Sequence, residues 1–382
     1  MLQTLYRISG IATFVVLTLG QLGRIQLPTG ALYLHDLSIS IAVFSWMVLM
    51  LKTKSSATFF NQIRHTLQKQ PLIVLTLGWI SLQVGLEVLV QHDGITLLYA
   101  GRLLLYALFV FSLTQSVKRK ELRGWILLSL LGHLWLGLLQ YVLLPDTRFL
   151  TALGWDDHYY RLISTLFDPS FTGLLFVFGY ILSLRLKKST VRWVCTFLFT
   201  IGIALTVSRA VWLAFLVGHG VMLLLSQTAK KENARVFIIS LIVLITTYAL
   251  MPKPGGLGVD LTRTQTVEAR GETLQQFALS PSELLTGGDM FGVQTTFGTP
   301  FIFYRIPDNS IQLILLVGGV PLLVLVGAIL VQFWTNTKTT ATQKALIMSL
   351  MTHSLFTASL IQPFVFLYFW STLWALGVKK AD

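Results

Sequence analysis

The chain has 382 residues, of which 54% are hydrophobic and only 12% carry a charge. Because so few charged side chains cannot solvate the surface of a soluble protein of this length, the composition excludes a soluble globular protein and makes lipid the solvent for most of the chain. The formal net charge is +13, and the single cysteine, Cys195, excludes an intramolecular disulfide.

Apolar stretches long enough to cross a bilayer recur along the whole chain. In hydrocarbon only helices and closed barrels satisfy every backbone polar group, and continuous apolar runs favour helices. The sequence therefore predicts an all-α, polytopic transmembrane bundle of about twelve spans, forming a single membrane domain over residues 1–382. No small-residue cleavage site accompanies the first span, so we expect it to be retained. The expected spans are 8–24, 32–51, 72–90, 95–116, 124–144, 169–185, 190–207, 209–227, 236–251, 309–334, 343–359 and 361–378.

Basic residues mark alternate connections between these spans. Four clusters of Lys and Arg, within 52–69, 118–123, 185–192 and 230–235, alternate with connections that carry few basic residues. Cytoplasmic loops of membrane proteins carry an excess of Lys and Arg. We therefore expect these four connections and both termini in the cytoplasm, and the intervening loops outside.

The arginines depart from this distribution. Thirteen of the fourteen lysines fall on the predicted cytoplasmic side, and only Lys253 falls outside. Arginine binds phosphate or carboxylate through paired hydrogen bonds, so arginines on the outer side suggest an anionic substrate. The alternative is that each forms an ordinary salt bridge with a nearby aspartate. The outer arginines are Arg24, Arg148, Arg161, Arg209, Arg263, Arg270 and Arg305.

Two outer connections are long, 145–168 and 252–308. The second is the large extracytoplasmic loop, in which 264–280 has the apolar spacing of an amphipathic helix. Arg263 and Arg270 are seven residues apart and would project from similar angles of that helix. One helix could therefore aim two guanidinium groups at the membrane surface, although a merely solvated amphipathic helix is the alternative.

Sequence motifs for several kinds of chemistry are absent from the chain. The chain has no Walker motif, no Rossmann fingerprint, no His-Glu-x-x-His and no paired cysteines, so ATP hydrolysis, redox chemistry and zinc catalysis lack support. Asp156-Asp157-His158 resembles a fragment of a metal site, but adjacent acids in a polar loop are more often solvated. We expect no metal and no cofactor.

Few ionisable residues lie within the spans. Glu87 and Arg102 lie at similar depths on consecutive spans and can pair, either as a structural ion pair or as support for an outer cavity. Three isolated histidines, His133, His219 and His353, are expected to be packed or hydrogen-bonded structural residues.

Four segments of the second half of the chain place polar residues at predicted outer ends of spans. They are Arg161 with Phe167-Asp168-Pro169-Ser170; Ser208-Arg209-Ala210-Val211-Trp212-Leu213; Glu268-Ala269-Arg270 with Leu279-Ser280-Pro281 and Leu285-Thr286-Gly287-Gly288; and Pro307-Asp308-Asn309-Ser310-Ile311-Gln312-Leu313 with Gly318-Gly319-Val320-Pro321. In this order they resemble the Arg…Asp-Pro-Asn, Ser-Arg-Gly/Ala-x-x-Leu, large-loop and His-Asn-Ser-x-Leu-Gln…Gly elements of the O-antigen ligase and O-antigen polymerase family of membrane glycan transferases. The resemblance covers 155–375.

The resemblance implies a GT-C-like fold in the bacterial inner (cytoplasmic) membrane and glycosyl transfer at its outer face. The donor would be a glycan on undecaprenyl diphosphate, and the acceptor a growing glycan, another lipid or a protein. The transfer would need no cofactor and no metal. Membrane lipids are the other expected partners, and no nucleic acid is expected.

Negative charge grows on the departing diphosphate during such a transfer, and arginines are suited to stabilising it. The resemblance implies three catalytic residues: Arg209 and Arg270 clamp the diphosphate, and Asp308 accepts or orients the acceptor's proton. The expected substrate-binding residues are Arg161, Arg305, Asp168 and Asn309.

Two positions depart from the family pattern. Asp308 stands where the family has histidine, which favours a polymerase or an atypical ligase, and Ser170 stands where asparagine is common. The competing class is a transporter or flippase of an anionic lipid-linked glycan, for which many helices and an outer basic cavity would also serve. A third possibility is a non-catalytic scaffold in a glycan-export complex.

Overall fold

The structure is a computed structural model, and nearly all of what it describes is α-helical. It describes residues 2–27, 30–53, 68, 71–91, 94–226, 230–253, 259–261, 268, 280–287, 293–295, 303–305 and 307–377. The chain divides into two compact units. Unit 1 contains Met1–Val16, Arg24–Val117 and Gly271–Asn336, and unit 2 contains Leu17–Gly23, Lys118–Arg270 and Thr337–Asp382.

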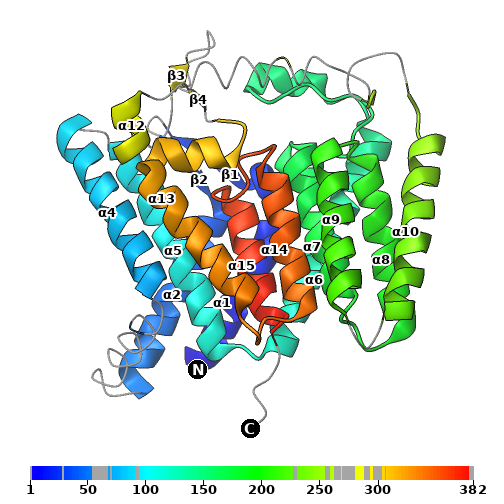
Figure 1. The fold of residues 1–382 in the computed structure, drawn as a ribbon, viewed down its shortest axis with the longest axis horizontal. Helices are drawn as coiled ribbons and strands as arrows, with labels where there is room; N and C mark the ends of the chain where they lie inside the picture. The colour runs from blue at the N-terminus through cyan, green and yellow to red at the C-terminus, as the bar shows by residue number, and fades with distance from the viewer. Residues whose placement is uncertain are drawn as a thin grey trace. The chain divides into compact units, whose positions relative to one another are not determined.

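Unit 1 is a group of helices with two short hairpins (Figure 1). Its helices are α1 (Leu2–Leu17, whose last residue falls in unit 2), α2 (Leu34–Thr53), α4 (Pro71–Gln91), α5 (Gly94–Ser116), α12 (Pro281–Thr286) and α13 (Ser310–Thr335). The hairpins pair β1 (Arg24–Leu27) with β2 (Gly30–Tyr33) and β3 (Val293–Thr295) with β4 (Phe303–Arg305), both antiparallel. α2 packs on α5, and both carry buried aromatic side chains: Trp46 in α2, and Tyr106 and Phe109 in α5. α4 packs on α13.

Helix α13 is broken at Gly318 and Gly319. Gly319 has φ 65° and ψ −166°, a conformation that is nearly restricted to glycine. The carbonyl of Gly318 accepts a hydrogen bond from the indole Nε1 of Trp79 in α4 (2.8 Å), so the break leaves no unsatisfied acceptor at that residue. A Cβ on Gly319 would lie 2.7 Å from the backbone of Leu285, because α12 packs directly against the break (Figure 1).

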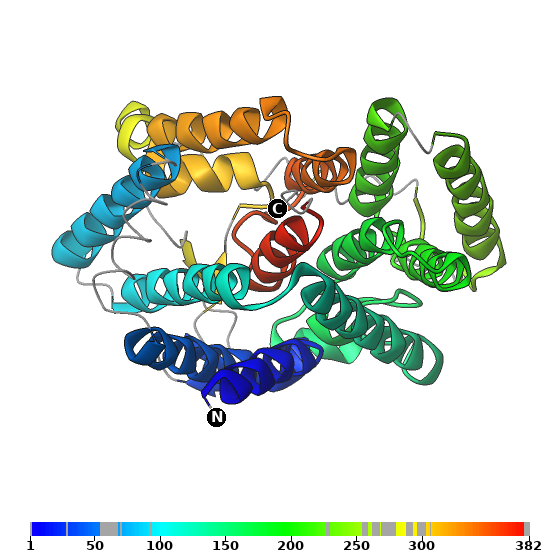
Figure 2. The same ribbon diagram turned by 90° about the horizontal axis from the view of Figure 1, so that it is seen from below.

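Unit 2 is built around one buried helix. α7 (Pro169–Ser183) is buried along almost its whole length and contacts five other helices. α9 and α14 lie side by side (Figure 2), and a Cβ on Gly218 of α9 would collide with the hydroxyl of Ser349 in α14. The other elements are η1 (Gly20–Gly23), α6 (Arg119–Leu143), η2 (Arg148–Leu153), η3 (Ser164–Leu166), α8 (Ser189–Leu205), α9 (Arg209–Leu225), α10 (Lys230–Leu250), α14 (Ala341–Ser354) and α15 (Pro363–Ala375).

The expected all-α character is confirmed, and each of the twelve predicted spans overlaps one helix. Among the described residues, five helices are long and apolar enough to cross a membrane, and five shorter ones are apolar. The long ones are Leu34–Lys52, Leu97–Ser116, Arg119–Leu143, Lys230–Leu250 and Ser310–Thr335. Such helices are compatible with a membrane protein, while the number of spans stays a prediction.

Exposed apolar side chains on these helices also suit a lipid surface. On α10, Ile238, Ile242 and Ile245 are each more than half exposed, and their spacing puts them on one face. A contiguous apolar face of this kind is unfavourable in water and favourable in hydrocarbon.

The first predicted span was wrong at its end. The prediction ran through residue 24, but α1 ends at Leu17. Gly20 then adopts φ +51°, where a Cβ would lie 2.4 Å from the carbonyl oxygen of Thr165, and Arg24 begins strand β1. The chain turns at this glycine because only glycine tolerates both the backbone angle and the close approach.

Candidate functional site

The residues expected at the site fall in different parts of the chain. Arg161, Asp168 and Arg209 belong to unit 2, and Asp308 and Asn309 belong to unit 1. Arg270 lies outside the described residues, as does the predicted helix 264–280 around it, apart from Glu268 and Ser280. Arg305 ends strand β4, but its side chain is likewise outside the described part.

Asp168 begins helix α7. Its Oδ1 accepts hydrogen bonds from the backbone N–H groups of Ser170 (2.6 Å) and Phe171 (2.8 Å), and Pro169 follows at the first helical position. An aspartate cap followed by proline is a strong local start signal for a helix. Burial raises the pKa of Asp168 to about 6, although the two N–H groups and the nearby Arg161 act in the opposite direction.

Arg161 is buried and holds the connection between α8 and α9. Its guanidinium donates from Nε to the carbonyl of Thr206 (2.9 Å) and from Nη2 to the carbonyl of Val207 (3.3 Å). The backbone N–H of Leu162 also donates to the carbonyl of Leu205 (2.9 Å). The segment around Arg161 is therefore fastened along the backbone that leads to Arg209.

Gln140 of α6 also hydrogen-bonds the segment around Arg161. Its Oε1 accepts from the backbone N–H of Ile163 (3.0 Å), and its Nε2 donates to the carbonyl of Arg161 (3.3 Å). Within unit 2, the connection 145–168 is thus held by the Gln140 side chain of α6 and by the bonds of its own Arg161 to the α8–α9 connection.

Arg209 is the first residue of α9, and its side chain is exposed. The sequence predicted a very short connection before Arg209, and three residues separate it from the end of α8. The Nη1 of Arg209 donates to the carbonyl of Leu261 (3.3 Å). Ser208 occupies the N-cap position, but its hydroxyl caps no backbone N–H of α9. The exposed guanidinium and the start of the helix therefore lie together at one end of α9.

The backbone around these residues is strained. In the part of the chain that the structure describes, four non-glycine residues have left-handed angles, with φ between 47° and 58°. They are Tyr160, Ser164, Phe167 and Val207. Each such angle is unfavourable by roughly 1 kcal/mol or more, and such angles collect at functional sites when the surrounding packing enforces them. Here they flank Arg161, Asp168 and Ser208.

A polar cluster joins the starts of α7 and α9. The hydroxyl of Ser170 lies 3.2 Å from that of Ser208 and 3.2 Å from Nε2 of His353, a residue in the last turn of α14. The Oγ1 of Thr357 is 3.5 Å from the same hydroxyl, and Nδ1 of His353 is 2.6 Å from the hydroxyl of Ser359. His353 was expected to be structural, and its place beside two motif residues was missed, because no local signal links positions 183 residues apart.

Asp308 and Asn309, the expected site residues of unit 1 whose side chains are described, differ in exposure and in hydrogen bonding. Asn309 caps α13, where its Oδ1 accepts the backbone N–H of Gln312 (2.8 Å). Asp308 precedes it and is exposed. The cap explains why an asparagine is suited to begin this helix, and it leaves the Asp308 carboxylate at the surface of its unit.

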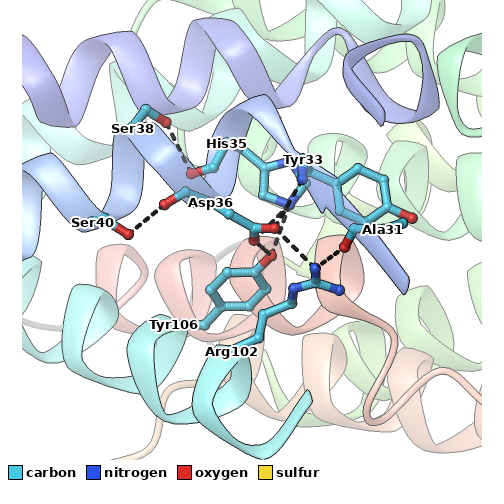
Figure 3. A network of polar contacts seen from close by, with 8 residues as sticks. All are labelled: Ala31, Tyr33, His35, Asp36, Ser38, Ser40, Arg102 and Tyr106. Atoms are coloured by element: carbon cyan, nitrogen blue, oxygen red, sulfur yellow. Dashed lines mark hydrogen bonds and ion pairs between the residues drawn. The ribbon is translucent and has the colours of Figure 1, made fainter. Parts of the chain in front are cut away.

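Arg102 has a partner that the sequence did not suggest. Arg102 of α5 forms an ion pair with Asp36 of α2, with 3.1 Å between Nη2 and Oδ2 (Figure 3). The expected partner, Glu87, has its side chain outside the described residues, so that pairing stays a prediction. The hydroxyl of Tyr106 donates to the Asp36 carboxylate and lies 2.8 Å from Nε2 of His35. Asp36 lies in the first turn of α2, the helix that packs on α5, so the packing of these two helices decides the pair.

This network is buried within unit 1 and links the β1–β2 hairpin to two helices. Asp36 also accepts the backbone N–H of Tyr33 (2.9 Å), and Arg102 donates to the carbonyl of Ala31 and lies over the ring of Tyr33 (Figure 3). A buried ion pair with this many hydrogen bonds satisfies both charges. Its arrangement is that of a structural pair.

Arg148, one of the arginines expected on the outer side, forms an ordinary salt bridge, which was the alternative to substrate binding. It forms an exposed salt bridge with Asp146, with 2.6 Å between Nη2 and Oδ2, and hydrogen bonding by Arg148 lowers the pKa of Asp146 to about 2. Among the residues that the structure describes, no three His, Cys, Asp or Glu side chains gather as a metal site requires.

Comparison with family models, with curated proteins and with solved structures finds no match to this chain.

Proposed function

We propose that this chain transfers a glycan from undecaprenyl diphosphate to a growing glycan or to another acceptor, at the outer face of a bacterial inner membrane. One observation carries the proposal. The two motif elements that start α7 and α9 meet in unit 2, where the Ser170 and Ser208 hydroxyls are 3.2 Å apart although 38 residues separate them in sequence. Arg161 is hydrogen-bonded to the connection that ends in Arg209.

In the proposed reaction Arg209 binds the diphosphate. Its side chain is exposed, and the α9 N-terminus beside it carries partial positive charge, so both favour a polyanion. The resemblance assigns Arg270 to the same diphosphate and Arg305 to substrate binding. Arg161 has two donors committed to backbone carbonyls, which makes it a positioning residue for Arg209 rather than a direct diphosphate ligand.

The transfer itself is a displacement at the anomeric carbon. The acceptor oxygen bonds to that carbon, the bond from the carbon to the diphosphate oxygen breaks, and undecaprenyl diphosphate leaves with the bonding electrons. The hydroxyl proton passes to a general base, the role that the resemblance assigns to Asp308, whose side chain is exposed in unit 1. Asn309, as the cap of α13, fixes the backbone next to Asp308.

The test uses the purified chain in nanodiscs with a lipid-linked oligosaccharide. Release of undecaprenyl diphosphate and the size of the glycan are measured for the wild type, for Arg209→Ala and for the control Arg148→Ala. Loss of a donor to a developing anion lowers the rate about 10²–10³-fold, so we expect that loss for Arg209→Ala and none for the control.

The outcomes separate the function classes. Longer glycans formed from the donor alone identify a polymerase, and release only after a second acceptor is added identifies a ligase. Movement of the intact donor across the bilayer without release would instead identify a flippase and refute the proposal. A normal rate for Arg209→Ala would refute its role on the diphosphate.

A further inference from the structure

We infer that His353 is a positioning residue of this site, which holds the starts of α7 and α9 together and so fixes Arg209. The inference rests on the proposed function for its effect on the rate, and on the structure alone for the contacts. His353 is fully buried in the last turn of α14, and no motif named above includes it.

The proposal includes an assignment of the hydrogen-bond directions. We assign the proton of the Ser359 hydroxyl to the carbonyl of Thr357 (3.3 Å), and the Ser359 oxygen then accepts from Nδ1 of His353 (2.6 Å). With the proton on Nδ1, the other nitrogen, Nε2, is an acceptor. The hydroxyl of Ser170 therefore donates to Nε2 of His353.

The series of hydrogen bonds continues from Ser170 to α9. Once the Ser170 proton is directed at His353, its oxygen accepts from the hydroxyl of Ser208 at 3.2 Å. Ser208 is then turned away from the first N–H groups of α9, in agreement with the observation that its side chain makes no cap bond. In this arrangement the Ser208 hydroxyl is oriented by His353 of α14 through Ser170.

This arrangement couples three helix ends. It joins the C-terminal end of α14 to the N-terminal ends of α7 and α9, next to Val207, whose φ of 47° is strained. Contacts that bear on a strained connection are needed to maintain it. Loss of the His353 contact frees Ser208 to cap α9, which relaxes the connection and displaces Arg209.

The test uses two amide replacements of different reach. In His353→Gln the amide extends to the position of Nε2 and can still bond Ser170, whereas in His353→Asn it reaches only the position of Nδ1. Displacement of a reacting group by about 1 Å can lower a rate about 10²-fold. We expect kcat to fall 10–100-fold in His353→Asn with KM for the donor nearly unchanged, and His353→Gln to recover most of the loss.

Two further variants establish that the effect passes through Ser170. Ser170→Ala should lower kcat as His353→Asn does, and the double variant should lose no more than either single one, because both remove the same contact. The control is His219→Asn. His219 is buried and hydrogen-bonded to Tyr180 (2.8 Å), but it lies ten residues after Arg209 on α9, about 15 Å along the helix, so kcat should be retained.

A second readout needs no glycan. In Cys195→Ser/Ser170→Cys, the introduced thiol lies beside Nε2 of His353, and a thiol next to such a base has a lowered pKa. Its alkylation by iodoacetamide is followed against pH with and without His353→Asn. We expect the apparent thiol pKa to rise when His353 is replaced.

The two measurements separately test the His353 contact, its positioning role and the proposed function. If the thiol pKa does not respond to His353→Asn, the contact is wrong and the inference falls. If it responds and the wild type transfers glycan, but kcat is unchanged in His353→Asn, the positioning role is refuted while the proposed function stands. If it responds and the wild type transfers nothing, the contact is right and the proposed function fails, taking the rate effect with it.

Discussion

Replacement of Arg161 by methionine tests whether this buried arginine is a clamp on the backbone. Methionine fills much of the same space but donates no hydrogen bond, so the carbonyls of Thr206 and Val207, both in fully buried residues, lose a donor. An acceptor left unsatisfied in the interior costs about 1–3 kcal/mol. Two of them predict a loss of roughly 2–6 kcal/mol in the free energy of unfolding.

The measurement is unfolding in mixed detergent micelles, followed by tryptophan fluorescence, for Arg161→Met and for Arg148→Met. Arg148 lies in the same connection, 145–168, but its side chain is 58% exposed and its ion pair is at the surface, so its replacement should have no measurable effect. Equal stabilities of the two variants would refute the clamp. A normal stability of Arg161→Met together with abolished transfer would show instead that the guanidinium binds substrate directly.

Two further predictions concern the break in α13 and the cap of α7. Gly319→Ala should lower the free energy of unfolding of unit 1 by roughly 2–5 kcal/mol, through backbone strain and overpacking. The control, Gly327→Ala, lies on the same helix with open space at its Cβ and should be neutral or stabilising. Similar unfolding curves for both variants would contradict the packing of α12 against the break. The pKa of Asp168 is raised above its unfolded value of 3.8, so its ionisation disfavours the folded state and stability should fall as the pH rises from about 4 to about 6. Asp168→Asn, which can still cap α7, should remove that dependence in unfolding titrations, and a persistent fall would assign it to another group.

The candidate site was predictable only where its signals are local. Asp168 and Pro169 start a helix from their own side chains, and Asn309 caps α13 through a hydrogen bond three residues away, so both positions are visible in the sequence. Arg209 was expected at a tight connection, and α8 and α9 are joined by three residues. These features depend on neighbours along the chain.

The roles of Arg161 and His353 depend on distant partners. Arg161 was selected as a cation on the outer side, but its donors meet carbonyls 45 and 46 residues away. His353 was taken as packing because it is isolated in apolar sequence, and its partners come from other segments. A hydrogen bond of this kind exists only when two helices pack in one register, which no local pattern records.

Apolar composition was enough to predict where twelve α-helices lie, although α1 ends earlier than expected. A run of apolar residues in lipid must satisfy its own backbone, so composition and length predict a helix, and each of the twelve predicted spans overlaps an α-helix. Three features depend on packing between helices: Arg102 pairs with Asp36, α13 breaks where α12 packs, and Ser170, Ser208 and His353 meet. A buried charge needs an opposite charge or a hydrogen bond beside it, and a broken helix needs donors for its free carbonyls. Packing between helices supplies these partners, and the order of residues within one helix does not.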